Sequence, residues 1–525
     1  MRRHRPPAMN PPRALHRAWT LLLRRPLAPA LTLALASACR GDDGGGDASV
    51  SEGSLSEGTV SEGTESTGGT TTGASATSEG STSEGSTSAG TDTGSGDPLL
   101  DALLAIEGME VEELEPLLPD TRLFALRFQQ PADHDDPAGP WFGQELTLFH
   151  RDVGAPMVLA TTGYTLPSRK FLSEPVALLE GNQIAVEQRF FGASRPDPAD
   201  WSDLTIAQAA ADHHRLVEAL RPIYGGAWVS TGASKGGMTS VYHRRFYPDD
   251  VDATIAYVAP HSLSDEDPRY EPYIDGIGDP ACADALRGAQ AEGLARRDAL
   301  AELLVDYADG EALTFDHLGL DRALEFAVVE SRFAFWQYGG EALCDGVPGP
   351  ASADQELFDW FDAISSFAYF SDDQLEHYGP YFYQAATELG APRIAEDHLG
   401  DLRLFPGEDT AALFSPPGLK VRYDPSAMQG VAAWIDAEGE RLLFLYGGRD
   451  PWTAGAFPLG GAADSRVYVV ADGNHGTKLA SLDDAEYDEA LQILFAWLGD
   501  AAPPPGERAL RRAQAQPWPR IGRAP

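Results

Sequence analysis

The chain has 525 residues, of which 43% are hydrophobic, and a formal net charge of −41. This length allows about two to four domains, and the apolar fraction is enough for a sizeable core. Eighty acidic side chains against 39 basic ones would repel a phosphate backbone, which argues against nucleic acid as a partner. No run of about 18 or more apolar residues occurs beyond the N-terminus, which excludes a polytopic membrane protein.

Residues 1–39 have the layout of a secretory signal peptide. A basic stretch precedes a short apolar run at residues 27–38, which is too short to span a bilayer comfortably. Residues 35–39 read Leu-Ala-Ser-Ala-Cys, which resembles a bacterial lipobox and predicts that Cys39 becomes a lipidated N-terminus after cleavage. Ala36 stands where a lipobox usually has Leu, so plain export is the alternative.

We therefore expect an exported protein, either a cell-envelope lipoprotein at the outer membrane or cell surface, or a secreted protein. Residues 40–97 consist of Ser, Gly, Thr and acids, with Ser-Glu-Gly recurring at 51, 56, 61, 78 and 83. Such a segment buries too little apolar surface to offset its ordering entropy. It predicts a disordered tether with a reach of roughly 40 Å, so that a lipid anchor would be the chain's only contact with a membrane.

From residue 98 to 500 the composition is globular, and short apolar runs alternate with helical patterns. This alternation predicts an α/β domain with a mostly parallel sheet. Between residues 262 and 439 the strand patterns give way to helical, aromatic-rich stretches, which predicts a helical cap inserted between two parts of the sheet domain, 98–261 and 440–500. We expect the Pro- and Arg-rich tail, 501–525, to be peripheral. The predicted strands are Leu123–Phe128, Glu145–His150, Met157–Thr161, Gln183–Glu187, Ala227–Thr231, Ala253–Val258, Leu442–Tyr446 and Val467–Val470, and a helix is predicted over Ile206–Ile223.

Two cysteines remain if Cys39 carries lipid. Both Cys282 and Cys344 fall inside the predicted cap. In an oxidising compartment an even pair is readily a disulfide, which is our prediction; two buried free thiols are the alternative.

The strongest chemical signal is Gly-Ala-Ser-Lys-Gly at residues 232–236. It directly follows a predicted strand and precedes a helical segment, which is the strand–turn–helix context of the nucleophile elbow in α/β-hydrolases. The serine of such an elbow occupies a strained turn, and only small neighbours let strand and helix approach so closely. We therefore predict that Ser234 is a nucleophile, as opposed to part of a simple Gly/Ser turn.

A serine of ordinary pKa needs a base, and the base needs an orienting carboxylate. In α/β-hydrolases these partners follow in the order Ser, Asp, His. Asp450 ends the strand-like run Leu-Leu-Phe-Leu-Tyr-Gly-Gly-Arg-Asp, and His475 lies just after the predicted strand Val467–Val470. Both should emerge at the edge of the sheet where Ser234 is displayed. The weaker alternatives are Asp472, His213, His214 and His261.

The same geometry predicts the oxyanion hole. One donor should be the backbone N–H of Lys235, at the N-terminus of the helix that follows the nucleophile. The second should come from the loop after the third predicted strand, and we assign it to the N–H of Tyr164, with Gly163 the nearest alternative. The side chain of Lys235 is expected to point to solvent.

Four motifs can be set beside those of known peptidases: Gly-Ala-Ser-Lys-Gly-Gly-Met-Thr, Glu-Gln-Arg-Phe-Phe-Gly-Ala-Ser-Arg-Pro from Glu187, Gly-Gly-Arg-Asp-Pro-Trp-Thr-Ala-Gly and Gly-Asn-His-Gly. Together they resemble the PS-10 family of serine peptidases, over roughly residues 120–500. A more distant similarity, which includes Phe-Gln-Gln-Pro-Ala-Asp-His at 128–134, is to the lysosomal Pro-X carboxypeptidase group. The resemblance implies a hydrolase domain with a helical cap, a triad carried onto Ser234, Asp450 and His475, and release of short proline-ended peptides from free N-termini.

The cap is where substrate specificity is expected. Its aromatic stretches suit a proline ring, which is flat and apolar, although most of these rings would also fit a helical core. An exopeptidase that binds a free α-amino group also needs carboxylates near its site. The substrate-binding candidates are Glu330, Trp336, Glu356, Asp359 and Trp360.

The leading hypothesis is a serine exopeptidase that acts on peptides and releases proline-containing tri- or tetrapeptides. Its alternatives are an esterase or lipase with the same triad, and a non-catalytic surface-binding lipoprotein on a hydrolase fold. No His-Glu-x-x-His, paired Cys-x-x-Cys, calcium loop or phosphate loop occurs, so neither a metal nor a cofactor is predicted. No obligate protein partner is evident.

Overall fold

The computed structural model of the chain describes residues 96–167, 170–500, 507 and 511–512. The predicted leader, the lipidation site at Cys39, nearly all of the tether and most of the tail lie outside the described residues. Among the helices in the described ranges, none is long and apolar enough to cross a membrane.

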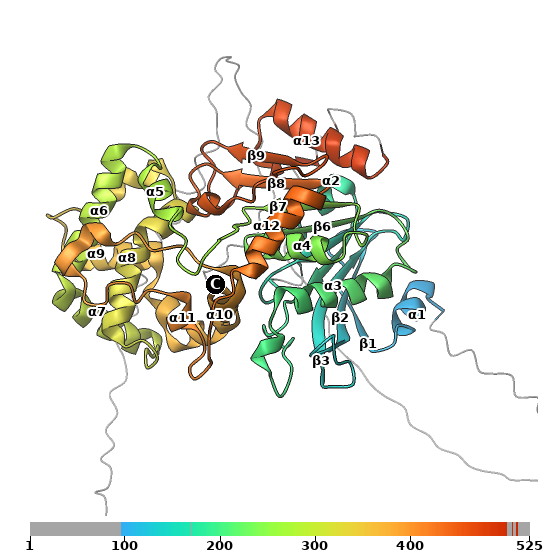
Figure 1. Cartoon of the computed structure of the whole chain (residues 1–525), viewed down its shortest axis with the longest axis horizontal. Coiled ribbons are helices and arrows are strands. Elements are labelled where there is room, and N and C mark those ends of the chain that lie inside the picture. Colours follow the sequence, from blue (N-terminus) through green and yellow to red (C-terminus); the bar gives the residue numbers. More distant parts are fainter. Residues whose placement is uncertain (1–95, 168–169, 501–506, 508–510, 513–525) are drawn as a thin grey trace, which may run out of the picture. The chain divides into compact units, whose positions relative to one another are not determined.

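Nine strands in the described part of the chain form one sheet, in the order β1-β2-β3-β5-β4-β6-β7-β8-β9 (Figure 1). The first three pairings along this order are antiparallel and all the later ones are parallel. The predicted α/β-hydrolase fold is confirmed, because the crossover between β4 and β5 and the parallel strands after it are the arrangement of that fold. The strands are β1 (Met109–Leu114), β2 (Arg122–Pro131), β3 (Trp141–His150), β4 (Met157–Thr161), β5 (Asn182–Val186), β6 (Trp228–Ala233), β7 (Ala253–Tyr257), β8 (Leu442–Gly447) and β9 (Arg466–Val470).

Helices cover both faces of this sheet, so its central strands are apolar on both sides. In β8, Leu443 and Leu445 pack with α2 and α13, whereas Leu442 and Phe444, which alternate with them, pack with α4 and α12. Successive side chains of a strand point to opposite faces, which explains why the central strands are continuous apolar runs. The flanking helices are α1 (Pro98–Leu104), α2 (Glu174–Leu179), α3 (Ile206–Leu220), α4 (Lys235–Phe246), α12 (Ser426–Glu438) and α13 (Asp484–Trp497).

The described residues between β7 and β8 form helices and no strand, and they have a hydrophobic core of their own. A disulfide joins Cys282 in α6 to Cys344, across 62 positions of the chain. Closing a loop of that length restricts the unfolded chain, which stabilises the fold by about 4 kcal/mol in the chain-entropy picture. The helices of this insertion are α5 (Tyr270–Asp275), α6 (Pro280–Ala295), α7 (Arg297–Glu311), α8 (Leu320–Tyr338), α9 (Asp354–Ser365), α10 (Asp372–Gln384) and α11 (Ala411–Phe414), with short helical turns η2 (Glu341–Gly346), η3 (Phe367–Phe370), η4 (Ala385–Leu389) and η5 (Asp397–Leu402).

The structure differs from the predicted organisation at three places. β1 was not predicted: half of its residues are Glu and only Met109 is buried, as suits an edge strand. The predicted cap boundary at residue 439 comes after α12, which packs on α4 and the sheet and also contacts η4 of the insertion. In the tail, Arg511 is buried and donates to the carbonyl of Leu178 at the end of α2, so this residue is not peripheral.

A buried arginine holds together the segments that follow β2 and β5. Arg189 is fully enclosed, and its guanidinium donates to both carboxylate oxygens of Asp212, at 2.7 and 2.8 Å. Its remaining N–H groups donate to three backbone carbonyls, those of Pro131, Ala132 and Asp203. All five guanidinium donors are therefore used, which compensates for removing the charge from water.

Replacing Arg189 with Met should lower the free energy of unfolding by about 3–5 kcal/mol, because it leaves the buried Asp212 carboxylate with only His134 as a side-chain partner. Arg127→Met is a matched control, since Arg127 pairs with Glu145 at 3.0 Å with 41% of its side chain exposed. That change should cost at most about 1 kcal/mol. Urea unfolding of the two variants measures the difference, and equal losses would contradict the role given to Arg189.

Candidate active site

Ser234 stands at the turn between β6 and α4. Its backbone has φ 54° and ψ −127°, a conformation that costs energy for a residue with a side chain. The turn is held on both sides, because its N–H donates to the carbonyl of Tyr257 in β7 and its own carbonyl accepts from Met238 in α4. The predicted strand–turn–helix context of Ser234 is therefore present.

Glycines make this turn possible. A Cβ atom on Gly232 would lie 2.3 Å from the carbonyl carbon and oxygen of Gly236, and one on Gly236 would lie 2.4 Å from the carbonyl oxygen of Thr161 at the end of β4. A Cβ on Gly163 would lie 2.6 Å from the backbone nitrogen of Gly236. The first turn of α4 is thus pressed against both its own strand and the loop after β4, with backbone on every side.

The structure brings Asp450 and His475 into contact. Nδ1 of His475 donates to Oδ2 of Asp450 at 2.7 Å, and both side chains are buried. Asp450 follows β8, where its Oδ1 also accepts from the N–H of Trp452, and His475 lies in the loop after β9. Nε2 of His475 is buried and has no hydrogen-bond partner among the described residues. A proton on Nδ1 leaves this second nitrogen as an acceptor.

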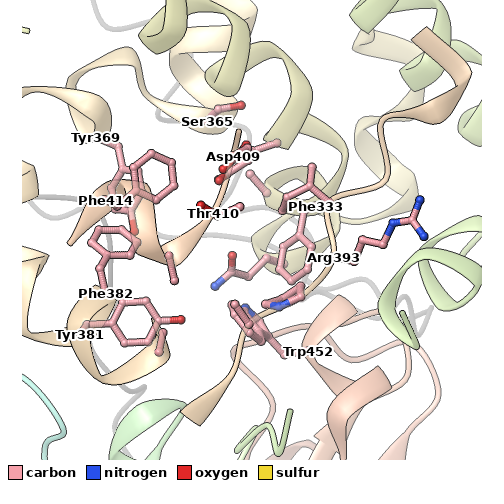
Figure 2. Close-up of a pocket in the computed structure, with 18 of the residues that line it drawn as sticks. Phe333, Ser365, Tyr369, Tyr381, Phe382, Arg393, Asp409, Thr410, Phe414 and Trp452 are labelled. Carbon is pink, nitrogen blue, oxygen red and sulfur yellow. The ribbon is translucent and has the colours of Figure 1, made fainter. Parts of the chain in front are cut away.

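A cavity of about 630 Å³ lies over the sheet edge, between it and the cap (Figure 2). Ser234 lines it, together with Trp452 and Tyr338, whose rings lie 6.2 and 5.8 Å from the imidazole of His475. The structure thus brings Ser234 to the cavity whose wall also packs against His475. Figure 2 shows aromatic rings along one side of this cavity, and the aromatic lining residues are Tyr164, Phe333, Tyr338, Tyr369, Tyr378, Tyr381, Phe382, Phe414 and Trp452.

The side chain of Lys235 does not point to solvent, so that expectation was wrong. It is 3% exposed, and Nζ donates to the carbonyl of Gly163 at 2.7 Å while lying over the rings of Tyr164 and Phe191. Burial lowers the pKa of this amine to about 7, with the nearby Glu388 acting in the opposite direction. The close approach of α4 to the loop after β4 encloses the lysine and leaves Gly163 as its acceptor.

Three further hydrogen bonds fix the loop after β4. Thr162 Oγ1 lies 2.7 Å from the carbonyl of Tyr164, that carbonyl also accepts from the N–H of Gln188, and Glu187 accepts from the N–H of Leu166. The N–H of Tyr164 makes only a long contact, 3.4 Å, to Thr162 Oγ1. The N–H of Lys235 is the first of α4, and first-turn N–H groups have no partner within their helix. The sequence predicted Glu187 only as part of a family motif. Its role as an acceptor for the loop after β4 was not predicted.

Of the five side chains predicted to contact substrate, the structure brings Glu330 to the cavity. The other four do not line it. Trp336 is buried in the apolar cluster around the disulfide, and Trp360 packs at the edge of the same cluster. Glu356 and Asp359 are exposed on α9, because the apolar stripe of this helix turns its acids outwards.

The alternatives to Asp450 and His475 lie elsewhere. Asp472 is exposed and pairs with Arg449, and His261 is buried with Nε2 against the carbonyl of Met428. His213 is buried beside His243, and burial lowers its pKa to about 3, so it stays neutral. His214 contacts Asp250. Within the described ranges, no group of three or more His, Cys, Asp or Glu side chains is arranged to hold a metal ion.

Comparison with known proteins gives a family. The model of the PS-10 peptidase S37 family matches residues 96–514. The prolyl tri/tetrapeptidyl aminopeptidase of Streptomyces mobaraensis is 40% identical over 407 residues, which are 76% of this chain and 85% of that protein. The chain belongs to the PS-10 peptidase S37 family. It is therefore a serine-type peptidase, and the family resemblance seen in its motifs is confirmed.

Similar solved structures are remote in sequence. An acetyl xylan esterase from Paenibacillus sp. R4 is 12% identical with a TM-score of 0.33, covering 74% of this chain and 88% of its own. A proline iminopeptidase from Mycobacterium smegmatis is 14% identical with a TM-score of 0.29, covering 78% of this chain and 100% of its own. The hydrolase fold of the peptidase follows from its strand order.

Replacing Lys235 with Met should change the stability of the peptidase in a pH-dependent way. The folded amine has a pKa of about 7, against an ordinary value of 10.5, so the unfolded chain binds more protons between these values and wild-type stability rises with pH there. Below about pH 7 the cost of the buried charge is fully present. The difference in the free energy of unfolding, Lys235→Met minus wild type, should therefore be about 2–3 kcal/mol larger at pH 6 than at pH 9.

Urea unfolding at the two pH values measures this change. The lost hydrogen bond to Gly163 lowers the variant's stability at both pH values, so it does not produce the difference between them. Lys420→Met is the control, since Lys420 is exposed and should show no such dependence. A Lys235→Met difference that stays constant with pH would contradict a neutral buried amine above pH 7.

Proposed function

We propose that this peptidase hydrolyses peptides behind proline and releases short peptides, three or four residues long, from free N-termini. Ser234 is the nucleophile, His475 the general base and then acid, and Asp450 the carboxylate that orients the imidazole. The observation that carries the proposal is the state of His475: one ring nitrogen is fixed by Asp450 while the other is buried and unpartnered beside the cavity that Ser234 lines.

The chemistry follows from this arrangement. Nε2 takes the proton of the Ser234 hydroxyl as the oxygen attacks the carbonyl carbon, and Asp450 stabilises the imidazolium that forms. The protonated Nε2 then gives its proton to the departing amine, which leaves an acyl group on Ser234. Water repeats the sequence, with Nε2 as base, and frees the acyl peptide.

Two backbone donors stabilise the oxyanion. The N–H of Lys235 is unpaired within its helix and lies at the positive end of α4. The N–H of Tyr164 is the second, and its peptide unit is anchored from the other side, because the Gly163 carbonyl of the same unit accepts from the Lys235 amine. Such a bond fixes the plane of the peptide and polarises its N–H, so Lys235 acts as a positioning residue.

Two observations support specificity for proline. The cavity has an aromatic lining, and the relative from Streptomyces mobaraensis is named prolyl tri/tetrapeptidyl aminopeptidase. A proline ring offers an apolar surface and no N–H, which matches a wall of aromatic rings better than a polar pocket. Action outside the cytoplasm is part of the proposal and is supported by the signal-like leader and by the disulfide.

The nucleophile can be tested by labelling with a fluorophosphonate probe, which bonds to an activated serine. Wild type should become labelled, whereas Ser234→Ala should take no label and lose at least about 10³-fold in kcat. Ser240→Ala is the control, because Ser240 is buried in the same helix and donates to the carbonyl of Gly237. Label retained by Ser234→Ala would place the nucleophile elsewhere.

The peptide specificity can be tested with one sequence in which proline is moved from position two to position five. Mass spectrometry should find release behind proline at positions three and four, and little release from the other peptides. Short acyl esters form the second arm. Rapid ester hydrolysis without cleavage of any peptide would show an esterase using the same three residues.

A further inference from the structure

A pair of acids lies in the wall of the cavity that contains Ser234. Glu330 comes from α8 and Asp409 from the loop before α11, and both line the cavity. Their side chains are hydrogen-bonded to each other, which requires that one of them carries a proton. Figure 2 shows the Asp409 carboxyl group directed into the space between the rings of Tyr369 and Phe333.

Among the described residues, neither acid of this pair forms an ion pair with a basic side chain. Burial raises the pKa of Glu330 to about 7, and that of Asp409 well above its ordinary value, to which neighbouring acids contribute. Those neighbours, Glu325 and Glu396, have arginines of their own, Arg297 and Arg403. Oδ2 of Asp409 is buried, and no donor reaches it among the described residues.

The other acids in the cavity wall are different. Asp397 pairs with Arg393 and Arg403, and Asp265 and Glu266 are exposed. Buried charges are normally paired, because desolvation costs several kcal/mol per ion. Two acids that share one negative charge inside a substrate cavity therefore form a site that is complete only when a cation enters it.

We propose that Glu330 and Asp409 bind the free α-ammonium group of the peptide substrate, a proposal that rests on the function proposed above. An ammonium group brings three N–H donors and one positive charge to a pair that has unfilled acceptors and a negative charge. With the ammonium in place both carboxyls can ionise, and the proton they shared is released to solvent.

The position of the pair relates to the length of peptide released. Gln337 follows Glu330 by seven positions in α8, and its carbonyl accepts from the N–H of His475 at 2.9 Å. At about 1.5 Å of rise per residue the two positions are roughly 10 Å apart along the helix. An extended chain covers that distance in about three residues. Along α8, Glu330 is thus about the length of an extended tripeptide from Gln337, which contacts the backbone of His475.

The experiment compares one proline-containing peptide p-nitroanilide with a free and with an acetylated N-terminus. Wild type should prefer the free form. In Glu330→Gln and in Asp409→Asn, kcat/KM for the free peptide should fall about 10- to 100-fold, mainly through KM, as expected when a charge-assisted hydrogen bond is lost. The acetylated peptide should be hydrolysed as by wild type, so the preference disappears. Glu266→Gln, which removes an exposed acid from the same cavity wall, should keep the preference for the free N-terminus.

A second measurement uses wild type alone. A tripeptide ending in proline should inhibit at least about ten-fold more strongly than its des-amino analogue, whether or not the variants fold. Equal inhibition, equal hydrolysis of free and acetylated substrate by wild type, or equal losses on both substrates in the variants would each overturn the assignment. Failure of wild type to take the fluorophosphonate label would instead overturn the proposed function itself.

Discussion

The site depends on one close contact between backbones, where the loop after β4 meets the first turn of α4. No side chain fits there, since a Cβ on Gly163 or on Gly236 would stand 2.6 or 2.4 Å from main-chain atoms of the other segment. This contact holds Ser234 in a conformation that an isolated turn would leave. It also encloses Lys235, which then has the Gly163 carbonyl as its acceptor. Ser234, α4 and the loop after β4 therefore form one rigid unit, which contains the proposed nucleophile and both proposed oxyanion donors.

The parts of this site that depend on local sequence could be predicted. The glycines on both sides of Ser234 indicate a strand–turn–helix segment. Asp450 and His475 each follow a short apolar strand. Because parallel strands end at one edge of a sheet, residues placed just after them meet even when they are far apart in the chain. The alternating burial of β8 shows why its strand pattern was clear, whereas β1, a polar edge strand, gave no comparable signal.

The parts that depend on the path of the cap could not be predicted. Aromatic residues dominate both its core and the cavity wall, and composition does not separate the buried Trp336 from the cavity-lining Phe333 three positions earlier. The partner of Glu330 is Asp409, 79 positions later and in a loop with no regular pattern. In a chain with 80 acids, what distinguishes this pair is that neither acid is ion-paired with an arginine among the described residues, and that is a property of the fold alone.

Helix α8 links the proposed ammonium site to the loop of the proposed base. One of its faces supplies Glu330 and Phe333 to the cavity, and its C-terminal end accepts the N–H of His475 through the carbonyl of Gln337. The side chain of Asn474 donates to the carbonyl of Gly339 just beyond the helix. A shift of α8 along its axis would move Glu330 and the imidazole loop together, so the distance between these two is fixed by the helix rather than by the packing of the cap on the sheet. A rigid helix is suited to this task because its rise per residue does not vary with the conformation of the surrounding loops. With the proposed function, the cap would therefore set the length of the peptide with the same helix that holds the loop of His475.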